Sequence, residues 1–334
     1  MKVRARLLAT GSASGLFALA ALGGACGGST PSGFGGGTDA GIGTDHTTQP
    51  ETDGPSIDGL HLGTDSGPET GKKDSSSGEA GTGTAVVYAE SPDTLYSLDP
   101  LTNAITVIGP FIGDCASQPG EGSFCATDCC DVTDIALDAE SNAYVTTFGA
   151  FYSLDLTTAS TKFIASNSYP NSLSFVPKGT LDPTEEALVG YNGATYVRID
   201  TTTGAITDVG GLTGGYASSG DIVSVIGGGT FLTVTGPGCS AGDCLLQVDP
   251  MTGDLIQNYG STNHSEVYGI AFWAGSVYGF DDEGQVFSIS YSSGSIVTTP
   301  IAVPSPPPGL AFWGAGSTTS APKSQPDGGG IPIK

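Results

Sequence analysis

A repeated segment constrains the fold of this chain more than any other feature. Residues 95–109, LYSLDPLTNAITVIG, alternate apolar and polar side chains, turn at DPLTN and alternate again. Four related segments follow, and the copies align on Asp99, Asp155, Asp200, Asp249 and Ser290. The spacings are 56, 45, 49 and 41 residues. Such a period is typical of one four-stranded blade of a β-propeller.

Each copy of this segment predicts a β-hairpin. Alternation of apolar and polar residues indicates a half-buried strand, and the Asp or Ser can accept hydrogen bonds from the turn amides. Asn103, Gly204, Gly253 and Gly294 supply a residue that tolerates a left-handed backbone, whereas Ala159 at this position predicts a looser turn. A metal-binding or catalytic role is the alternative for these aspartates. Their presence in nearly every hairpin favours turn capping.

A second segment recurs out of phase with the first and predicts the inner strand of each blade. Its copies begin at Asp134, Ser172, Asp221, Gly269 and Gly309. Apolar residues alternate there with Ala or Ser, as expected where strands crowd around a propeller axis. Each repeat has a further strand between the inner-strand segment and the hairpin segment. The predicted order is therefore inner strand, second strand, third strand, turn and outer strand.

The two ends of the repeat region complete each other. Residues 84–110 contain three strands of a blade without an inner strand, and residues 308–314 contain an inner strand alone. We therefore predict an all-β, five-bladed β-propeller, closed by a C-terminal inner strand that joins the N-terminal blade. Six blades would result if residues 113–131 hold a diverged repeat. A β-sandwich with similar hairpins is the alternative fold.

The hairpin segments resemble bacterial propeller repeats of the L-Y-x-I-D-x-x-T-G kind, found in quinoprotein-like and NHL-like extracytoplasmic proteins. Quinoprotein blades carry a docking Trp shortly after the Thr-Gly, and these segments have none. The resemblance therefore implies a scaffold but no quinone cofactor. Trp273 and Trp313 end consecutive predicted inner strands, where we expect them to pack in the core or at the rim.

The N-terminal residues have the layout of an export signal. Residues 1–25 contain a basic start, a short apolar run and small residues, which predicts a signal peptide. The segment LGGAC resembles the lipobox of bacterial lipoproteins, although Leu22 lies four rather than three residues before Cys26. The resemblance implies that Cys26 is lipidated and that the membrane is a partner, with an extracytoplasmic location. Ordinary secretion is the alternative.

Composition divides the rest of the chain. Residues 26–83 are rich in Gly, Ser, Thr, Pro and Asp, which predicts a disordered tether, and residues 317–334 similarly predict a disordered tail. The propeller is expected over residues 84–316. That region has 24 acidic residues against three basic ones, Lys162, Lys178 and Arg198. Nucleic acid is therefore excluded as a partner, because phosphate binding requires clustered basic residues.

Six cysteines lie in the predicted propeller, an even number that favours disulfides in an exported chain. Cys239 and Cys244 flank a four-residue loop and are expected to pair. The others are Cys115, Cys125, Cys129 and Cys130. We expect Cys129 and Cys130 each to bond backwards, one to Cys115 and one to Cys125. Zinc is the alternative for these four, but their spacing lacks paired C-x-x-C motifs.

The chemistry-bearing residues suggest binding more than catalysis. His264 is the one histidine of the predicted propeller, where we expect it to be solvated. Polar residues near the predicted channel mouth are Asp131, Asp134, Asn171, Asp221 and Glu266. Three readings remain open: they satisfy inner-strand amides and face water, they bind calcium, or two of them act as acid and base, as in five-bladed glycoside hydrolases.

The function predicted from the sequence is an envelope module that binds or scaffolds a protein or a carbohydrate, without a cofactor. The alternative is a carbohydrate-active hydrolase or calcium-dependent enzyme. Its acidic residues would lie at the mouth of the channel.

Overall fold

The computed structural model describes residues 87–114, 131–292 and 294–325. All of them fall within one compact unit, Ser77–Lys334. The predicted signal peptide, Cys26 and tether lie outside the described residues, as do Cys115, Cys125, Cys129 and Cys130. Within the described ranges, no helix is long and apolar enough to cross a membrane.

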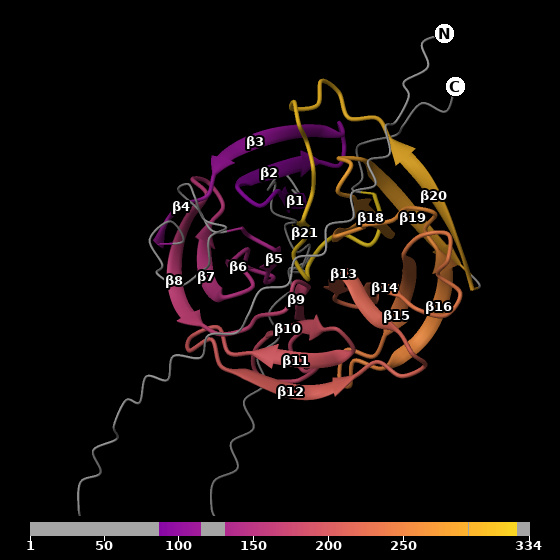
Figure 1. The fold of residues 1–334 in the computed structure, drawn as a ribbon, viewed down its shortest axis with the longest axis horizontal. Coiled ribbons are helices and arrows are strands. Elements are labelled where there is room, and N and C mark those ends of the chain that lie inside the picture. The colour runs from indigo at the N-terminus through magenta and orange to yellow at the C-terminus, as the bar shows by residue number, and fades with distance from the viewer. Residues whose placement is uncertain (1–86, 115–130, 293, 326–334) are drawn as a thin grey trace, which may run out of the picture. The chain divides into compact units, whose positions relative to one another are not determined.

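The described strands form five antiparallel sheets arranged around a common centre (Figure 1). From the centre outward, blade one contains β21 (Gly314–Gly316), β1 (Val87–Glu90), β2 (Thr94–Asp99) and β3 (Ala104–Pro110). Blade two contains β5 (Asp134–Leu137), β6 (Ala143–Thr146), β7 (Ala150–Asp155) and β8 (Ser160–Ser166). Blade three contains β9 (Leu173–Val176), β10 (Ala187–Asn192), β11 (Thr195–Ile199) and β12 (Ile206–Gly211).

Blade four contains β13 (Ala217–Val225), β14 (Gly229–Thr235), β15 (Cys244–Val248) and β16 (Leu255–Ser261). Blade five contains β17 (Gly269–Trp273), β18 (Ser276–Phe280), β19 (Val286–Ser292) and β20 (Ser295–Ile301). The short strand β4 (Ile112–Gly113) pairs in parallel with β8 at the outer edge of blade two. The predicted all-β fold with five blades is therefore confirmed, and β4 adds a strand to blade two where a sixth blade was the alternative.

Apolar side chains fill the space between each pair of neighbouring blades. Five buried clusters lie at the five interfaces, and each draws residues from two adjacent sheets. The cluster between blades five and one joins Phe280 and Trp273 to Leu98 and Phe312. Because this last interface is as well filled as the others, burial of apolar surface holds the ring closed.

Strand β21 closes the ring by pairing with β1, with Ala315 opposite Ala89 and Gly314 opposite Glu90. The closure was predicted, but the strand lies at Gly314–Gly316 rather than within residues 309–313. Crowding explains the shift. A Cβ atom on Gly316 would lie 2.7 Å from the Ile135 carbonyl oxygen, so bulky residues do not fit this strand. Trp313 therefore precedes the inner strand, whereas Trp273 ends β17 as expected.

The ordered contacts continue beyond the predicted domain boundary at residue 316. The Ser317 hydroxyl oxygen accepts a hydrogen bond from the Phe272 amide at 2.9 Å, and the Pro322 carbonyl accepts one from Ala274 at 2.7 Å. Thr319 is buried. Residues 317–325 thus belong to the packed structure, contrary to the predicted tail. Residues 326–334 lie outside the described part of the chain.

The predicted turn capping is confirmed in the first four hairpins. The Asp200 carboxylate accepts hydrogen bonds from the amides of Thr202 and Thr203 at 2.9 and 2.7 Å, and Asp99, Asp155 and Asp249 accept equivalent bonds. The prediction of a looser turn at Ala159 is wrong. Ala159 adopts a φ of 56° and its amide still bonds the Asp155 carbonyl at 2.9 Å.

Candidate ligand-binding site on the propeller axis

A pocket of about 200 Å³ lies where the chain enters the inner strands. Its lining residues are Thr133, Tyr268 and Trp313, which directly precede β5, β17 and β21, and Asn171, which lies two residues before β9. The fifth, Phe148, lies in the turn between β6 and β7. Four of the five blades therefore contribute a residue at a similar height along the axis. This end of the ring gathers three aromatic side chains, because entry positions on different blades converge at the centre.

Two aromatic side chains of the pocket differ in how they are held. The Trp313 indole N–H donates a hydrogen bond to the Asp282 carboxylate at 3.1 Å. The Trp313 amide also donates to the Glu90 carbonyl at 2.8 Å, which ties the pocket to β1. The Phe148 ring makes no such bond and is 63% exposed. The pocket therefore combines a fixed wall with an open rim.

Two buried aspartates lie directly below this layer. Asp134 and Asp221 begin equivalent positions of the inner-strand repeat and are fully buried. Asp134 accepts hydrogen bonds from its neighbour Ile135 at 2.8 Å and from Leu173 on the next blade. Inner strands expose one row of amides toward the axis, so an acceptor that bridges two blades satisfies donors that the sheets leave unpaired.

Asp221 repeats this arrangement on the other side of the ring. Its carboxylate accepts bonds from the Ile222 amide at 2.5 Å and from the Ile270 amide on the next blade at 2.8 Å. The two aspartates also share a side-chain hydrogen bond, which raises the pKa of Asp134 and partly offsets the effect of burial on the pKa of Asp221. Together they link blades two to five around the channel.

Glu90 completes the buried acidic cluster, which we define as Glu90, Asp134 and Asp221. It is fully buried, and neither of its carboxyl oxygens has a hydrogen-bond partner among the described residues. Its side chain occupies the space beside Gly314, where any Cβ atom would overlap Glu90 Oε1. The missing side chain at Gly314 thus gives a carboxyl from the adjacent strand its place at the axis.

Burial raises the pKa of all three carboxyls of the cluster well above their ordinary values. For Glu90, the charge of Asp221 raises the pKa further. For Asp134, the charges of Asp221 and Glu90 act in the same direction after burial. Because three negative charges cannot be buried together without counterions, the cluster retains protons to a higher pH than exposed carboxyls do.

The predicted channel-mouth residues occupy different places in the structure. Asn171 lines the pocket, while Asp134 and Asp221 lie beneath it, shielded from water rather than facing it. Asp131 lies away from the axis near Asp93, whose charge adds to burial in raising the pKa of Asp131. Glu266 is exposed, and its charge helps to raise the pKa of Tyr268 after burial.

Sequence reasoning missed Glu90 and the aromatic pocket residues. Glu90 belongs to a second strand, and only the pairing of β1 with β21 brings it to the axis. Tyr268 and Trp313 carry a signal that was available, since each immediately precedes the glycine that starts an inner strand. Phe148 lies in the turn after β6, and the sequence carries no comparable signal there.

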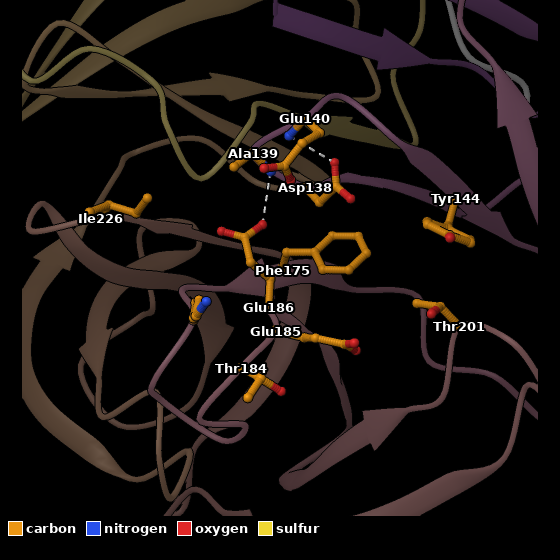
Figure 2. A pocket seen from close by; sticks show the side chains of 11 residues that line it. Asp138, Ala139, Glu140, Tyr144, Phe175, Thr184, Glu185, Glu186, Thr201 and Ile226 are labelled. Carbon is orange, nitrogen blue, oxygen red and sulfur yellow. Dashed lines mark hydrogen bonds between the residues drawn. The ribbon is translucent and has the colours of Figure 1, made fainter. Parts of the chain in front are cut away.

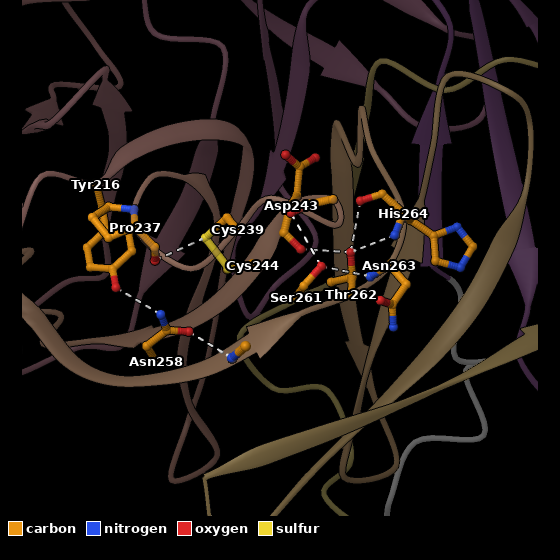
Figure 3. The surroundings of a disulfide bond; sticks show 12 residues. Tyr216, Pro237, Cys239, Asp243, Cys244, Asn258, Ser261, Thr262, Asn263 and His264 are labelled. Carbon is orange, nitrogen blue, oxygen red and sulfur yellow. Dashed lines mark hydrogen bonds between the residues drawn. A yellow bond between two sulfur atoms is a disulfide. The ribbon is translucent and has the colours of Figure 1, made fainter.

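The predicted disulfide between Cys239 and Cys244 is confirmed, with a Cα–Cα distance of 5.4 Å (Figure 3). It closes the loop that carries Asp243, whose carboxylate accepts a hydrogen bond from the Val267 amide at 2.9 Å. Val267 directly precedes Tyr268. The disulfide loop is therefore joined to the pocket wall through one hydrogen bond.

His264 is packed rather than solvated, contrary to expectation. Its ring stacks on Phe287 with centroids 3.7 Å apart, and Nδ1 lies 3.1 Å from the Asp281 carboxylate. The imidazole ring of His264 leaves the solvent because stacking on Phe287 removes one of its faces from water. His264 does not line the axial pocket.

A second pocket of about 480 Å³ lies beyond the opposite ends of β5 and β9 (Figure 2). Glu186 points between the blades and accepts hydrogen bonds from the Ala139 amide at 2.8 Å and the Thr319 hydroxyl at 2.5 Å. Asp138 accepts bonds from the amides of Glu140 and Asn142 at 3.0 and 2.7 Å. These carboxylates organise loops, so the axial pocket is the stronger candidate.

The acidic cluster lacks the geometry of a glycosidase. Acid and base carboxyls in glycosidases lie about 5–9.5 Å apart, with the sugar between them. Asp134 and Asp221 instead share a hydrogen bond in a buried site. Among the residues that the structure describes, no group of three or more His, Cys, Asp or Glu is arranged to hold a metal ion.

No protein-family model matches the chain, and no curated protein matches it. Among solved structures, hydrazine synthase of Kuenenia stuttgartiensis shares 13% identity, with a TM-score of 0.36 over 64% of this chain and 65% of its own. The Dos1 propeller shares 12% identity, with a TM-score of 0.35 over 62% of this chain and 54% of its own. The extracellular domain of a one-component system from B. thetaiotaomicron shares 12% identity, with a TM-score of 0.34 over 69% and 28%.

Proposed function

We propose that this chain is an extracytoplasmic binding module, anchored to the envelope through lipidated Cys26, whose ligand occupies the axial pocket. The observation that carries the proposal is the convergence of Phe148, Tyr268 and Trp313 around a cavity of about 200 Å³. Ligand sites are commonly concave and lined by aromatic side chains, with few polar groups.

The shape of the pocket favours recognition of a small group. A volume near 200 Å³ is below the usual range for a drug-sized ligand, so a single sugar ring, side chain or headgroup fits better than an extended polymer. Such a group can belong to a larger protein or carbohydrate of the envelope. The signal-peptide layout and lipobox-like segment support placement at the membrane surface.

Intrinsic fluorescence tests this proposal, because the chain has two tryptophans and one of them lines the pocket. Trp273→Phe isolates the signal of Trp313. This change is conservative, since the buried Trp273 indole N–H has no partner among the described residues. Titration with small sugars, amines and peptides is expected to give a saturable change for at least one class.

Phe148→Ala should weaken that binding at least tenfold, because the change removes one aromatic wall of the pocket. Leu101→Ala is the matched control, since Leu101 is 58% exposed on a turn of blade one. No ligand-dependent change across the whole panel, in a protein that melts like the unmodified chain, would refute the axial site.

A further inference from the structure

We propose that the axial pocket binds a quaternary ammonium group, an inference that rests on the proposed function of this pocket. The juxtaposition that points to it is an aromatic wall without a basic residue in the lining, next to carboxylates that bond Trp313 or act on Tyr268. A quaternary nitrogen has no N–H to donate and is recognised through aromatic faces and negative charge.

The walls of the pocket suit a cation without hydrogen-bond donors. Phe148 presents only carbon and hydrogen, and the indole N–H of Trp313 is already donated to Asp282. Bonding to a carboxylate makes the indole ring more electron-rich and leaves its face as the available surface. Three aromatic residues around about 200 Å³ therefore match the apolar surface and positive charge of a trimethylammonium group.

The charges around the pocket are negative at the rim. Asp282 holds the Trp313 indole. Glu266, Asp282 and Asp243 all act on Tyr268, where their charges add to burial in raising its pKa. These carboxylates disfavour an anionic ligand and attract a cation to the entrance of the pocket.

The buried acidic cluster lies below the pocket. Glu90 is fully buried and has no hydrogen-bond partner among the described residues, so a positive charge bound above it would favour the ionised form of its carboxyl. Among the described residues, the basic side chains lie elsewhere. Lys178 lines the second pocket, and Arg198 pairs with Asp182 at 3.2 Å. Among the residues that the structure describes, no Lys or Arg lines the axial pocket.

A primary ammonium is a poorer match, because it needs acceptors for three N–H groups. The oxygens of Asp134 and Asp221 already accept backbone amides. The Thr133 hydroxyl is paired with Thr146 within the blade. Asn171 is left as the one side-chain amide in the pocket lining. Asn171 and the Tyr268 hydroxyl are the acceptors left in the lining, so a primary amine would exchange three hydrogen bonds to water for fewer in the pocket.

Three small ligands separate the alternatives. The full chain with Trp273→Phe is titrated with choline, with its neutral isostere 3,3-dimethyl-1-butanol and with ethanolamine, using Trp313 fluorescence and calorimetry. Choline is expected to bind at least tenfold more tightly than either of the others. Equal affinity for choline and the neutral isostere, or tighter binding of ethanolamine, would overturn the inference while leaving the axial site intact.

A conservative variant tests the charge directly. Asp282→Asn keeps an acceptor for the Trp313 indole and removes one negative charge, so choline affinity should fall about threefold while the neutral isostere is unaffected. Asp208→Asn removes an exposed carboxylate on β12 and should change neither. An equal loss for both ligands in Asp282→Asn would show a change of shape and contradict the electrostatic role.

A separate experiment tests whether the quaternary ammonium group belongs to a lipid headgroup or to a free amine. Co-sedimentation of the protein with phosphatidylcholine vesicles, abolished by free choline, would support a lipid headgroup as the ligand. Binding of choline without vesicle binding would support a free quaternary amine. Failure of every ligand in the panel to change Trp313 fluorescence would count against the proposed function itself, so the two failures are distinguishable.

Discussion

At the scale of single residues, four aspartates perform the same task in four hairpins. Hydrogen bonds from the backbone amide and hydroxyl of Thr203 hold the pKa of Asp200 below its ordinary value. For Asp99, burial is the largest single influence and raises the pKa, but the hydrogen bonds from Thr102 and Leu101 together outweigh it and lower the pKa. At Asp99 and Asp200 the ionised carboxylate is therefore the form that stabilises the turn, and its contribution is lost as the pH falls through the lowered pKa of the folded state.

Asp200→Ala removes three hydrogen bonds from the turn of blade three. The free energy of unfolding at pH 7 should fall by about 1 kcal/mol, as for loss of a capping side chain. Urea unfolding measures the change, with Asp208→Ala on the following strand as the control. A loss that does not shrink as the pH is lowered through the titration of the folded carboxylate would contradict a role for the charged form.

At the scale of strands, the inner ends of the blades carry a different kind of carboxyl. Glu90 on β1 and the inner-strand residues Asp134 and Asp221 have pKa values raised first by burial. The folded state therefore keeps protons that the unfolded chain releases above pH 4. This linkage lowers stability as pH rises from about 4 toward the folded pKa values. The turn aspartates act in the opposite direction, at lower pH.

Glu90→Gln tests this linkage. In the unmodified chain the free energy of unfolding should decrease between pH 5 and pH 8, by up to about 1.4 kcal/mol per pH unit for each proton released on unfolding. The variant should show a shallower decrease, because it removes one titrating group and its repulsion of Asp134. Urea unfolding at four pH values measures the slope. An unchanged slope would show that Glu90 does not titrate within the cluster.

Most strands were predictable from the sequence because alternation and turn residues are local signals. The inner strands at Asp134–Leu137 and Gly269–Trp273 follow the predicted segments closely. The position of β21 was not predictable in this way. Residues 309–313 closely match the sequence of β17, but only Gly314–Gly316 is small enough to fit beside β5 and β17. That requirement arises from neighbouring blades and is absent from the local pattern.

The candidate site was only partly predictable for the same reason. Asp134 and Asp221 begin the inner-strand segment in their repeats and Asn171 directly precedes it, so the sequence places all three near the axis. Glu90 reaches the axis through the pairing of β1 with a strand more than two hundred residues away. Its burial, and that of the two aspartates, depends on how five sheets close around one centre, which no single repeat specifies.

At the scale of the whole molecule, the C-terminal segment holds the ring in two ways. Strand β21 completes blade one. Residues 317–325 then run along the ends of the inner strands β5, β13 and β17. The Thr319 carbonyl accepts a hydrogen bond from the Ile226 amide at 2.9 Å, and Thr318 forms an isolated parallel β-bridge with Leu137. Amides at the ends of β13 and β17 thus obtain acceptors that their own blades do not provide.

Three truncations separate these contributions. Ending the chain at residue 325 should leave the melting temperature unchanged. Ending it at residue 316 removes acceptors for Phe272, Ala274 and Ile226, which should lower the free energy of unfolding by roughly 3–5 kcal/mol at about 1 kcal/mol or more per lost bond. Ending it at residue 313 also removes β21, and cooperative melting should be lost because blade one then lacks the inner strand that the C-terminal part of the chain supplies. Calorimetry and urea unfolding compare the three, and cooperative melting of the shortest chain at the temperature of the intermediate one would show that the ring closes without β21.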